Sequence, residues 1–203
     1  MAGKAAPAKA PGKRAYHHGN LREALIAESL ELIREQGVRG LTLREIGHRL
    51  NVSRTAPYRH FADKAALLSA ISKTGFAKFA EDLERARDRA GTEFGSRMDA
   101  MARAYVRFAA ENPGSFEVMF GAGRQPQHLD ESASAEAQRA FAVLHEEILH
   151  GQQTGAVAPG DSLAFARLAW AMVHGLATLR MFDDQKFTDF CSRALRRGLS
   201  PGL

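Results

Sequence analysis

The sequence predicts an all-α protein with a small basic head and a larger helical body. Apolar residues recur at helical spacing along most of the chain, and no segment shows the alternation typical of a strand. Residues 1–73 hold 13 basic and 6 acidic side chains, whereas residues 74–203 hold 15 and 17. This charge asymmetry suggests a reader of polyanions, although a solvated basic face would have the same composition. We expect about nine helices, three of them in the head.

Composition places the chain among soluble globular proteins, with 45% hydrophobic and 25% charged residues. The single cysteine, Cys191, excludes an internal disulfide framework and fits a reducing compartment. No run of about 18 uncharged apolar residues is present, so no membrane span is expected. The N-terminal residues lack the apolar stretch of a secretory signal. We therefore expect a cytoplasmic protein.

The chain is expected to divide into an arm, a head and a body. Residues 1–15 are Ala, Pro, Gly and Lys for the most part, and cannot bury enough apolar surface to become ordered. We interpret them as a flexible basic arm that either attracts phosphate or serves only as a solubilising tail. The head is expected over residues 16–75 and the body over residues 76–203.

The head begins with two helices that carry clear boundary signals. In residues 20–37, leucines and isoleucines recur at helical spacing, and Gly37 stands where a helix C-cap needs a positive φ. Thr42 and Glu45 then form the capping-box pattern at the start of a second, short helix.

A helix–turn–helix motif is predicted over about residues 42–61. Asn51 tolerates the left-handed conformation of a tight turn, and Ser53 is a favoured N-cap for a third helix. Pro57 would be the fourth residue of that helix, where its missing N–H removes only the first intrahelical bond. We therefore predict a helix with an irregular first turn, whose free N–H groups favour a phosphate.

The body is predicted to be helical throughout. Asp63 can cap a long helix that links it to the head, and the Asn-Pro-Gly sequence at 112–114 ends the helix that follows. Residues 163–182 are apolar on almost every face. This pattern predicts a helix that is either central in the body or packed on one side against a partner chain.

The first third of the chain resembles the DNA-binding head of TetR family (TetR/AcrR-like) transcriptional regulators. The resemblance spans residues 18–75 and rests on a helix that ends in Gln-Gly, followed by GLTLREIGHRLNVSRTAPYRHFADKAALL. The residues that stand in the family's places are Thr42, Tyr58, His60, Phe61 and Lys64. A weaker likeness to the Trp-His-Gly subgroup lies in Trp170, His174 and Gly175.

The resemblance implies an all-α homodimer with a three-helix head and an effector-binding body that dimerises through residues 161–198. The expected function is a ligand-responsive repressor that binds a palindromic operator. Double-stranded DNA, a second copy and an unidentified small molecule are the expected partners; no cofactor, metal or membrane is expected. Gly47, Asn51 and Pro57 depart from the family pattern, and Pro57 puts the tilt of the third helix in question.

The predicted DNA-binding residues lie in and beside the third helix. Arg54 and its two neighbours stand where base edges are reached in the major groove, although Arg54 could contact phosphate alone. By resemblance, Tyr58, His60 and Lys64 hold phosphates. For Arg44, the alternatives are a surface pair with the histidine one turn later and a solvated charge. The full set is Thr42, Arg44, Ser53, Arg54, Thr55, Ala56, Tyr58, Arg59, His60 and Lys64.

Candidate effector-binding residues lie in the body. They are Arg103, Arg107, Phe116, Met119, Phe120, Trp170 and His174. The two arginines could meet an acidic effector, although surface arginines on an amphipathic helix are the simpler interpretation. The phenylalanines and the methionine suit a pocket wall or core packing equally well. His174 lies one turn after Trp170 and fits either contact with a ligand or a structural role in which its ring is hydrogen-bonded within the protein.

Enzyme chemistry is not expected. His145 and His150 lie five residues apart, so they do not share a helical face as a zinc-protease pair does. Cys191 has no motif around it and is interpreted as an inert structural thiol. Two other function classes stay open: a sequence-tolerant architectural DNA-binding protein, and an effector-free adaptor that acts through the apolar helix at 163–182.

Overall fold

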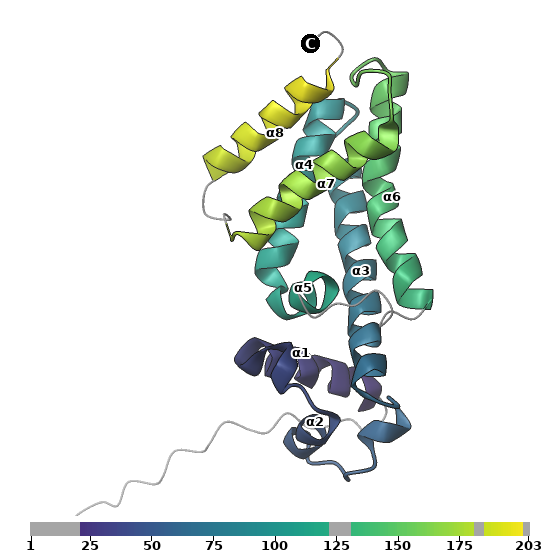
Figure 1. The fold of residues 1–203 in the computed structure, drawn as a ribbon, viewed down its shortest axis with the longest axis vertical. Helices are drawn as coiled ribbons and strands as arrows, with labels where there is room; N and C mark the ends of the chain where they lie inside the picture. Colours follow the sequence, from purple (N-terminus) through teal and green to yellow (C-terminus); the bar gives the residue numbers. More distant parts are fainter. Residues whose placement is uncertain (1–20, 122–130, 181–184, 201–203) are drawn as a thin grey trace, which may run out of the picture.

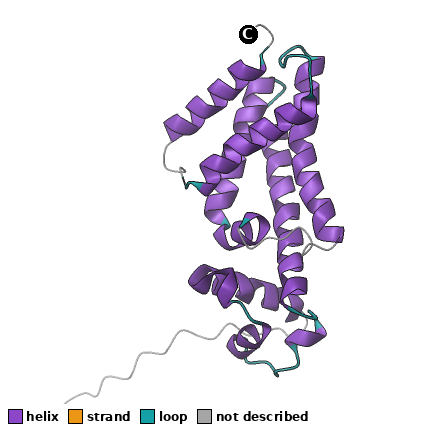
Figure 2. Cartoon of the chain, viewed as in Figure 1, coloured by secondary structure: helices purple, strands orange, loops and turns teal. Residues whose placement is uncertain are grey.

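The computed structural model describes residues 21–121, 131–180 and 185–200 (Figure 1). In these ranges the chain forms eight α-helices and one short 3-10 helix, and no strand (Figure 2). The predicted all-α class is therefore confirmed. The predicted arm at residues 1–15 lies outside the described residues. No helix within the described ranges is long and apolar enough to cross a membrane.

The helices follow one another along the chain as α1 Leu21–Gly40, α2 Leu43–Arg49, η1 Pro57–Arg59, α3 Lys64–Arg89, α4 Phe94–Glu111, α5 Pro113–Phe120, α6 Glu131–Gln153, α7 Ser162–Thr178 and α8 Gln185–Leu199. The head contains α1, α2, η1 and the first turns of α3. The body contains the remainder of α3 and the helices that follow (Figure 1).

Two hydrophobic cores form along α3. The head core includes Leu67 and Ile71 of this helix, and the body core begins on the same helix at Phe76 and Phe79. Asp63 caps α3 as predicted, because its carboxylate accepts the N–H of the third helical residue at 2.8 Å. One continuous helix therefore carries the head on the body, and a displacement of the body end of α3 displaces the head.

In the body, α4 and α6 lie along α3, while α7 crosses the front of this layer and α8 covers α4 (Figure 1). Asp99 of α4 holds α8 in place, since its carboxylate accepts a hydrogen bond from Ser192 and lies 3.3 Å from the Arg196 guanidinium. At the lower end of the body, α5 packs directly on α1 of the head.

The apolar helix predicted at 163–182 corresponds to α7, and it is not central in the chain. Ala166, Ala169 and Ala177 face the body core, but Leu168 on the opposite face is 53% exposed. This helix was predicted to be either central in the body or packed on one side against a partner chain. The central position is wrong, because no described helix of this chain covers the outer face of α7.

Candidate nucleic-acid interface and body pockets

Three boundary signals of the head are confirmed, but the predicted N-cap at Ser53 is wrong, because η1 begins after Ala56 and has no side-chain cap. Gly37 has a φ of 70° and interrupts α1, so the chain turns where a left-handed residue was predicted. The Thr42 hydroxyl caps α2 by accepting the N–H of Glu45 at 3.2 Å. Asn51 has a φ of 55° in the tight turn after α2. These three residues place the segment after α2 on the outer edge of the head.

That segment is a series of tight turns, so the predicted irregular first turn is confirmed, while the α-helix expected to continue from it is wrong. Residues 54–56 form a turn, and only the three residues of η1 are helical. The N–H of Ala56 donates to the Ser53 carbonyl at 3.0 Å, and the N–H of His60 donates to the Pro57 carbonyl at 3.0 Å. Because proline has no N–H to donate to Ser53, the α-helical bond cannot form and a bond one residue shorter replaces it.

Pro57 is buried against α2. A Cβ placed on Gly47 would lie 2.9 Å from Cγ of Pro57, closer than real Cβ atoms approach. Two departures from the TetR pattern are thus one structural feature, because the proline ring occupies the space that an alanine at position 47 would need.

Three arginines on this edge of the head are available for a polyanion. Arg44, Arg54 and Arg59 are exposed and form no hydrogen bond or ion pair with any residue that the structure describes. Arg44 and Arg54 line one groove, of about 510 Å³, together with Thr42 and His48. Arg44 forms no pair with this histidine, so the solvated charge is the alternative to DNA contact that remains.

Arg49 contrasts with these arginines because its charge is used within the head. Its guanidinium lies 2.7 Å from Glu35, 3.4 Å from Glu28 and 3.4 Å from Glu45. The hydrogen bond from Arg49 lowers the pKa of the Glu35 carboxyl. Arg49 thus joins α2 to α1.

Most of the other predicted interface residues lie on the same outer edge as the free arginines. The exposed ones are Ser53, Thr55, Tyr58 and His60, and Ala56 is half-buried beside them.

Lys64 differs, because its ammonium donates to the carbonyl of Val38 at 2.7 Å, and partial burial lowers its pKa. It ties α3 to the end of α1, and we leave it out of the proposed DNA contacts. Sequence reasoning also missed Arg22, whose guanidinium lies 5.2 Å from the ring centre of Phe61.

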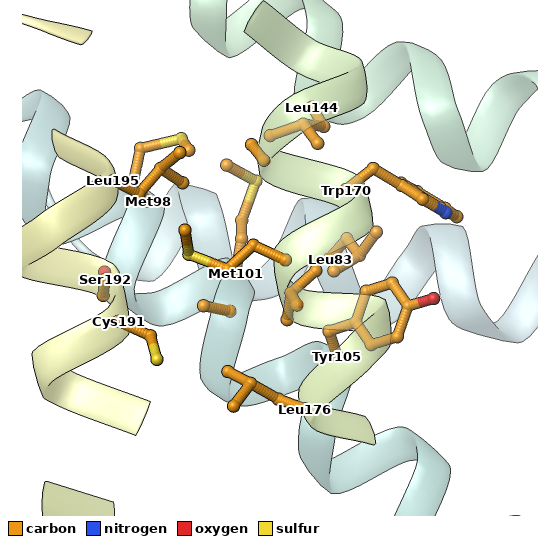
Figure 3. Close-up of a pocket in the computed structure, with 14 residues that line it drawn as sticks. Leu83, Met98, Met101, Tyr105, Leu144, Trp170, Leu176, Cys191, Ser192 and Leu195 are labelled. Carbon is orange, nitrogen blue, oxygen red and sulfur yellow. The ribbon is translucent and has the colours of Figure 1, made fainter. Parts of the chain in front are cut away.

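Three hollows in the body bring some of the predicted effector residues together. The inner cavity, of about 50 Å³, lies among α4, α7 and α8 (Figure 3). The α6–α7 pocket, of about 640 Å³, lies between α6 and α7, and the α1–α5 cleft, of about 590 Å³, lies where the head meets the body. Trp170 lines both the inner cavity and the α6–α7 pocket, and Phe120 lines both the α6–α7 pocket and the α1–α5 cleft.

The seven predicted effector residues differ in whether they line these hollows. Phe116, Phe120, Trp170 and His174 line the hollows, and Met119 is fully buried in the body core. The arginines at 103 and 107 are exposed and line none of the three hollows, so the surface interpretation is correct for them. Their helix turns its Ala, Met, Tyr and Phe side chains inward and leaves both guanidinium groups in solvent.

Sequence reasoning missed Tyr105, which is fully buried and holds His174. The Tyr105 oxygen lies 2.8 Å from Nδ1 of His174, and Thr178 Oγ1 lies 3.2 Å from Nε2. Burial raises the pKa of the Tyr105 hydroxyl and lowers the pKa of His174. The phenol therefore stays protonated, and Tyr105 and Thr178 together satisfy both ring nitrogens of His174. The predicted satisfied histidine is confirmed, although the same ring also lines the α6–α7 pocket.

Cys191 is half-buried and lines the inner cavity, across from Trp170 and Tyr105 (Figure 3). Met98 and Met101 lie beside it, and thioether side chains adapt readily to irregular space. Among the described residues, no group of three or more His, Cys, Asp or Glu side chains is arranged to hold a metal ion.

Comparison with known protein families decides what this architecture is. The family model described as bacterial regulatory proteins of the tetR family matches residues 25–71. A second model, described as the tetracyclin repressor-like C-terminal domain, matches residues 98–199, half of the chain. The chain belongs to the TetR family. The predicted family is therefore confirmed, while the Trp-His-Gly subgroup stays a resemblance.

Individual relatives of this TetR-family protein agree. The HTH-type transcriptional regulator Mb1846 of Mycobacterium bovis is 28% identical over 149 residues, which cover 70% of this chain and 64% of the relative. The chain thus spans slightly less than two thirds of that relative's length. The class C tetracycline repressor protein of Escherichia coli is 46% identical over 52 residues, which cover 26% of this chain and 24% of that protein.

Solved structures share the fold of this TetR-family protein. A protein with unknown function from Rhodococcus sp. RHA1 has a TM-score of 0.81 and 32% identity, and the match covers 93% of this chain and 100% of that chain. A bacterial regulatory protein of the tetR family from Rhodococcus RHA1 has a TM-score of 0.71 and 22% identity, over 89% of this chain and 97% of that one. The second likeness shows the fold alone.

Proposed function

We propose that the protein is a DNA-binding transcriptional regulator, and that it represses transcription as a homodimer on a palindromic operator. The observation that carries the proposal is the set of three exposed, unpaired arginines, Arg44, Arg54 and Arg59, at the edge of a helix–turn–helix head. Such a head presents side chains to the major groove, where arginine pairs with guanine. Relatives named as transcriptional regulators and as tetracycline repressors support the regulatory role.

A second copy is proposed to cover the outer face of α7 and α8. Leu168, Leu179 and Phe190 are 53%, 72% and 58% exposed, and large exposed apolar side chains mark interaction surfaces. A two-fold axis at this face presents two heads to successive major-groove segments. The cytoplasmic location predicted from the sequence follows from DNA binding and stays a prediction.

A small molecule in the body is proposed to release the DNA. Phe116 and Phe120 of α5 line hollows in the body, and Glu117 between them accepts the N–H of Val38 at the end of α1, at 3.4 Å. A ligand that moves α5 therefore also moves α1. Release requires the ligand to prefer the state in which the heads no longer match the operator spacing.

A regulator and an architectural DNA-binding protein use the same basic head, so the test must separate them. Purified protein is mixed with fragmented genomic DNA from its source, and the bound fragments are footprinted. A regulator protects an inverted repeat with half-sites about 10 base pairs or a little more apart. Uniform protection without a repeated sequence, or selectivity below about 10³-fold, supports the architectural alternative.

A further inference from the structure

We infer that the effector is an uncharged, planar aromatic molecule and that it binds in the α6–α7 pocket. This inference rests on the proposed regulatory function and specifies the chemistry of its ligand. The pocket is lined by aromatic side chains from several helices, and its volume of about 640 Å³ falls within the range of small-molecule sites.

The aromatic wall favours a flat, apolar ligand. Trp170 lies 5.6 Å from Phe141 and 6.3 Å from Phe120 between ring centres, and Phe76 lies 5.3 Å from Phe120. All three pairs meet edge to face or nearly so. Phe120, Phe141 and Trp170 are only half-buried and leave apolar surface exposed to the pocket. A further aromatic ring gains both apolar burial and edge-to-face contacts there.

The described polar lining carries no ammonium, guanidinium or carboxylate group. No Lys, Arg, Asp or Glu stands among the described residues that line the pocket. His174 is neutral, because burial lowers its pKa, and both its ring nitrogens have partners within the protein. His145 has its Nε2 2.9 Å from Ser162 Oγ. A carboxylate placed against these rings would lose part of its hydration without a Lys or Arg in return, which opposes an acidic effector.

Gln138 is one polar side chain of the lining that can orient the ligand. Gln138 of α6 lines the pocket, is exposed, and forms no hydrogen bond with another described residue. Its amide can donate to a carbonyl or nitro oxygen or accept from a hydroxyl group. Arg167 is the cation nearest to the lining along α7, between Leu163 and Trp170, but it is exposed and does not line the pocket.

The pocket contains its own reporter, because Trp170 is the single tryptophan of the chain. Full-length protein is titrated with 4-nitrotoluene and, separately, with 4-nitrobenzoate, and the quenching of tryptophan fluorescence is followed. The two probes share a nitrophenyl ring and differ in a methyl group or a carboxylate. We expect saturable quenching by 4-nitrotoluene with an affinity at least 10-fold higher than that of 4-nitrobenzoate.

Matched variants locate the binding. Ala142→Phe fills the α6–α7 pocket and should weaken 4-nitrotoluene binding at least 10-fold, whereas Ala102→Phe narrows the inner cavity and should leave it unchanged. Arg167→Ala should also leave it unchanged. If Ala142→Phe does not fold, as judged by circular dichroism, Phe141→Ala replaces it and should weaken binding through the lost ring contact with Trp170.

Three results would overturn the inference. The first is binding of 4-nitrobenzoate that is as tight as or tighter than that of 4-nitrotoluene, above all if Arg167→Ala abolishes it. The second is the absence of saturable quenching by either probe. The third is loss of 4-nitrotoluene binding in Ala102→Phe rather than in Ala142→Phe. The genomic footprint is independent of these titrations. If the protein protects an inverted repeat but does not bind 4-nitrotoluene, only the ligand assignment is overturned. If it binds 4-nitrotoluene but protects no inverted repeat, only the proposed regulatory function is overturned.

Discussion

Pro57 and Gly47 fit together as one contact between the turn segment and α2. The proline ring lies where a Cβ on residue 47 would approach to 2.9 Å, and the ring is buried. Each residue is unfavourable by itself, since glycine weakens a helix and proline removes a backbone donor. Together they set the position of Arg54 and its neighbours relative to the rest of the head.

Gly47→Ala should therefore lower operator affinity by at least 10-fold, although alanine is the better helix former. The added methyl group must displace the Pro57 ring and with it the arginine-bearing turn. Gly47→Ala combined with Pro57→Ala should bind better than Gly47→Ala alone, because the clash is removed. Fluorescence anisotropy of the unaltered protein, Gly47→Ala, Pro57→Ala and the double variant on one operator gives the interaction energy. Strictly additive effects would contradict the contact.

Glu117 should couple the body to the head. Val38 donates its N–H to Glu117 at 3.4 Å, and its carbonyl accepts a hydrogen bond from the Lys64 ammonium, so one residue joins α5, α1 and α3. Glu117→Ala removes one hydrogen bond, and amide exchange in the peptide that contains Val38 should accelerate roughly 3- to 10-fold. Hydrogen-exchange mass spectrometry measures this directly.

The control for Glu117 is Glu111→Ala, since Glu111 is also exposed and has no hydrogen-bond partner among the described residues. Glu117→Gln keeps an acceptor oxygen and should retain most of the protection. If exchange near Val38 is the same in Glu117→Ala and in the unaltered protein, the coupling does not run through this carboxylate.

His174 should make the folded state sensitive to mild acid. Burial lowers its pKa below the ordinary value of 6.5, so the unfolded chain binds the proton more readily than the folded one. The stability that this difference contributes is complete above about pH 6.5 and is lost as the pH falls below it. Thermal unfolding between pH 7.5 and 5.5 should show a smaller loss of melting temperature in His174→Asn. Equal slopes in both proteins would contradict the assignment.

Leu168→Glu should convert the protein to a monomer. The leucine stands on the exposed face of α7, and a carboxylate there would be buried without a partner in the proposed dimer. Sedimentation velocity should show a single species of about 22.2 kDa. Leu149→Glu is the control, because Leu149 is also partly exposed but lies on α6, and this variant should remain dimeric.

Much of the head was predictable because its signals are local. The glycine at 37, the threonine cap at 42 and the left-handed asparagine at 51 each act within three residues of themselves. The third helix was predicted wrongly although the missing donor of Pro57 was recognised. The burial of its ring against Gly47, a contact ten residues away in the chain, was not visible in the sequence.

The body pockets were less predictable because they depend on contacts between distant helices. Helical spacing marks Trp170 and Phe120 as apolar positions, but their approach to 6.3 Å across α5 and α7 is a tertiary fact. Tyr105 was missed because its partner His174 lies 69 residues later. Arg103 and Arg107 were candidates on charge alone, and the orientation of α4 places both in solvent.

We expect the head to read a specific DNA sequence as part of a dimer. Selection of binding sites from a pool of random duplexes, at low and at physiological salt, measures this. We predict an enriched inverted repeat at both salt concentrations, and Arg54→Ala should relax one base position in each half-site at a cost of about 1–3 kcal/mol. A pool without enrichment, bound by attraction that collapses steeply as salt rises, would show phosphate contacts alone and contradict the account.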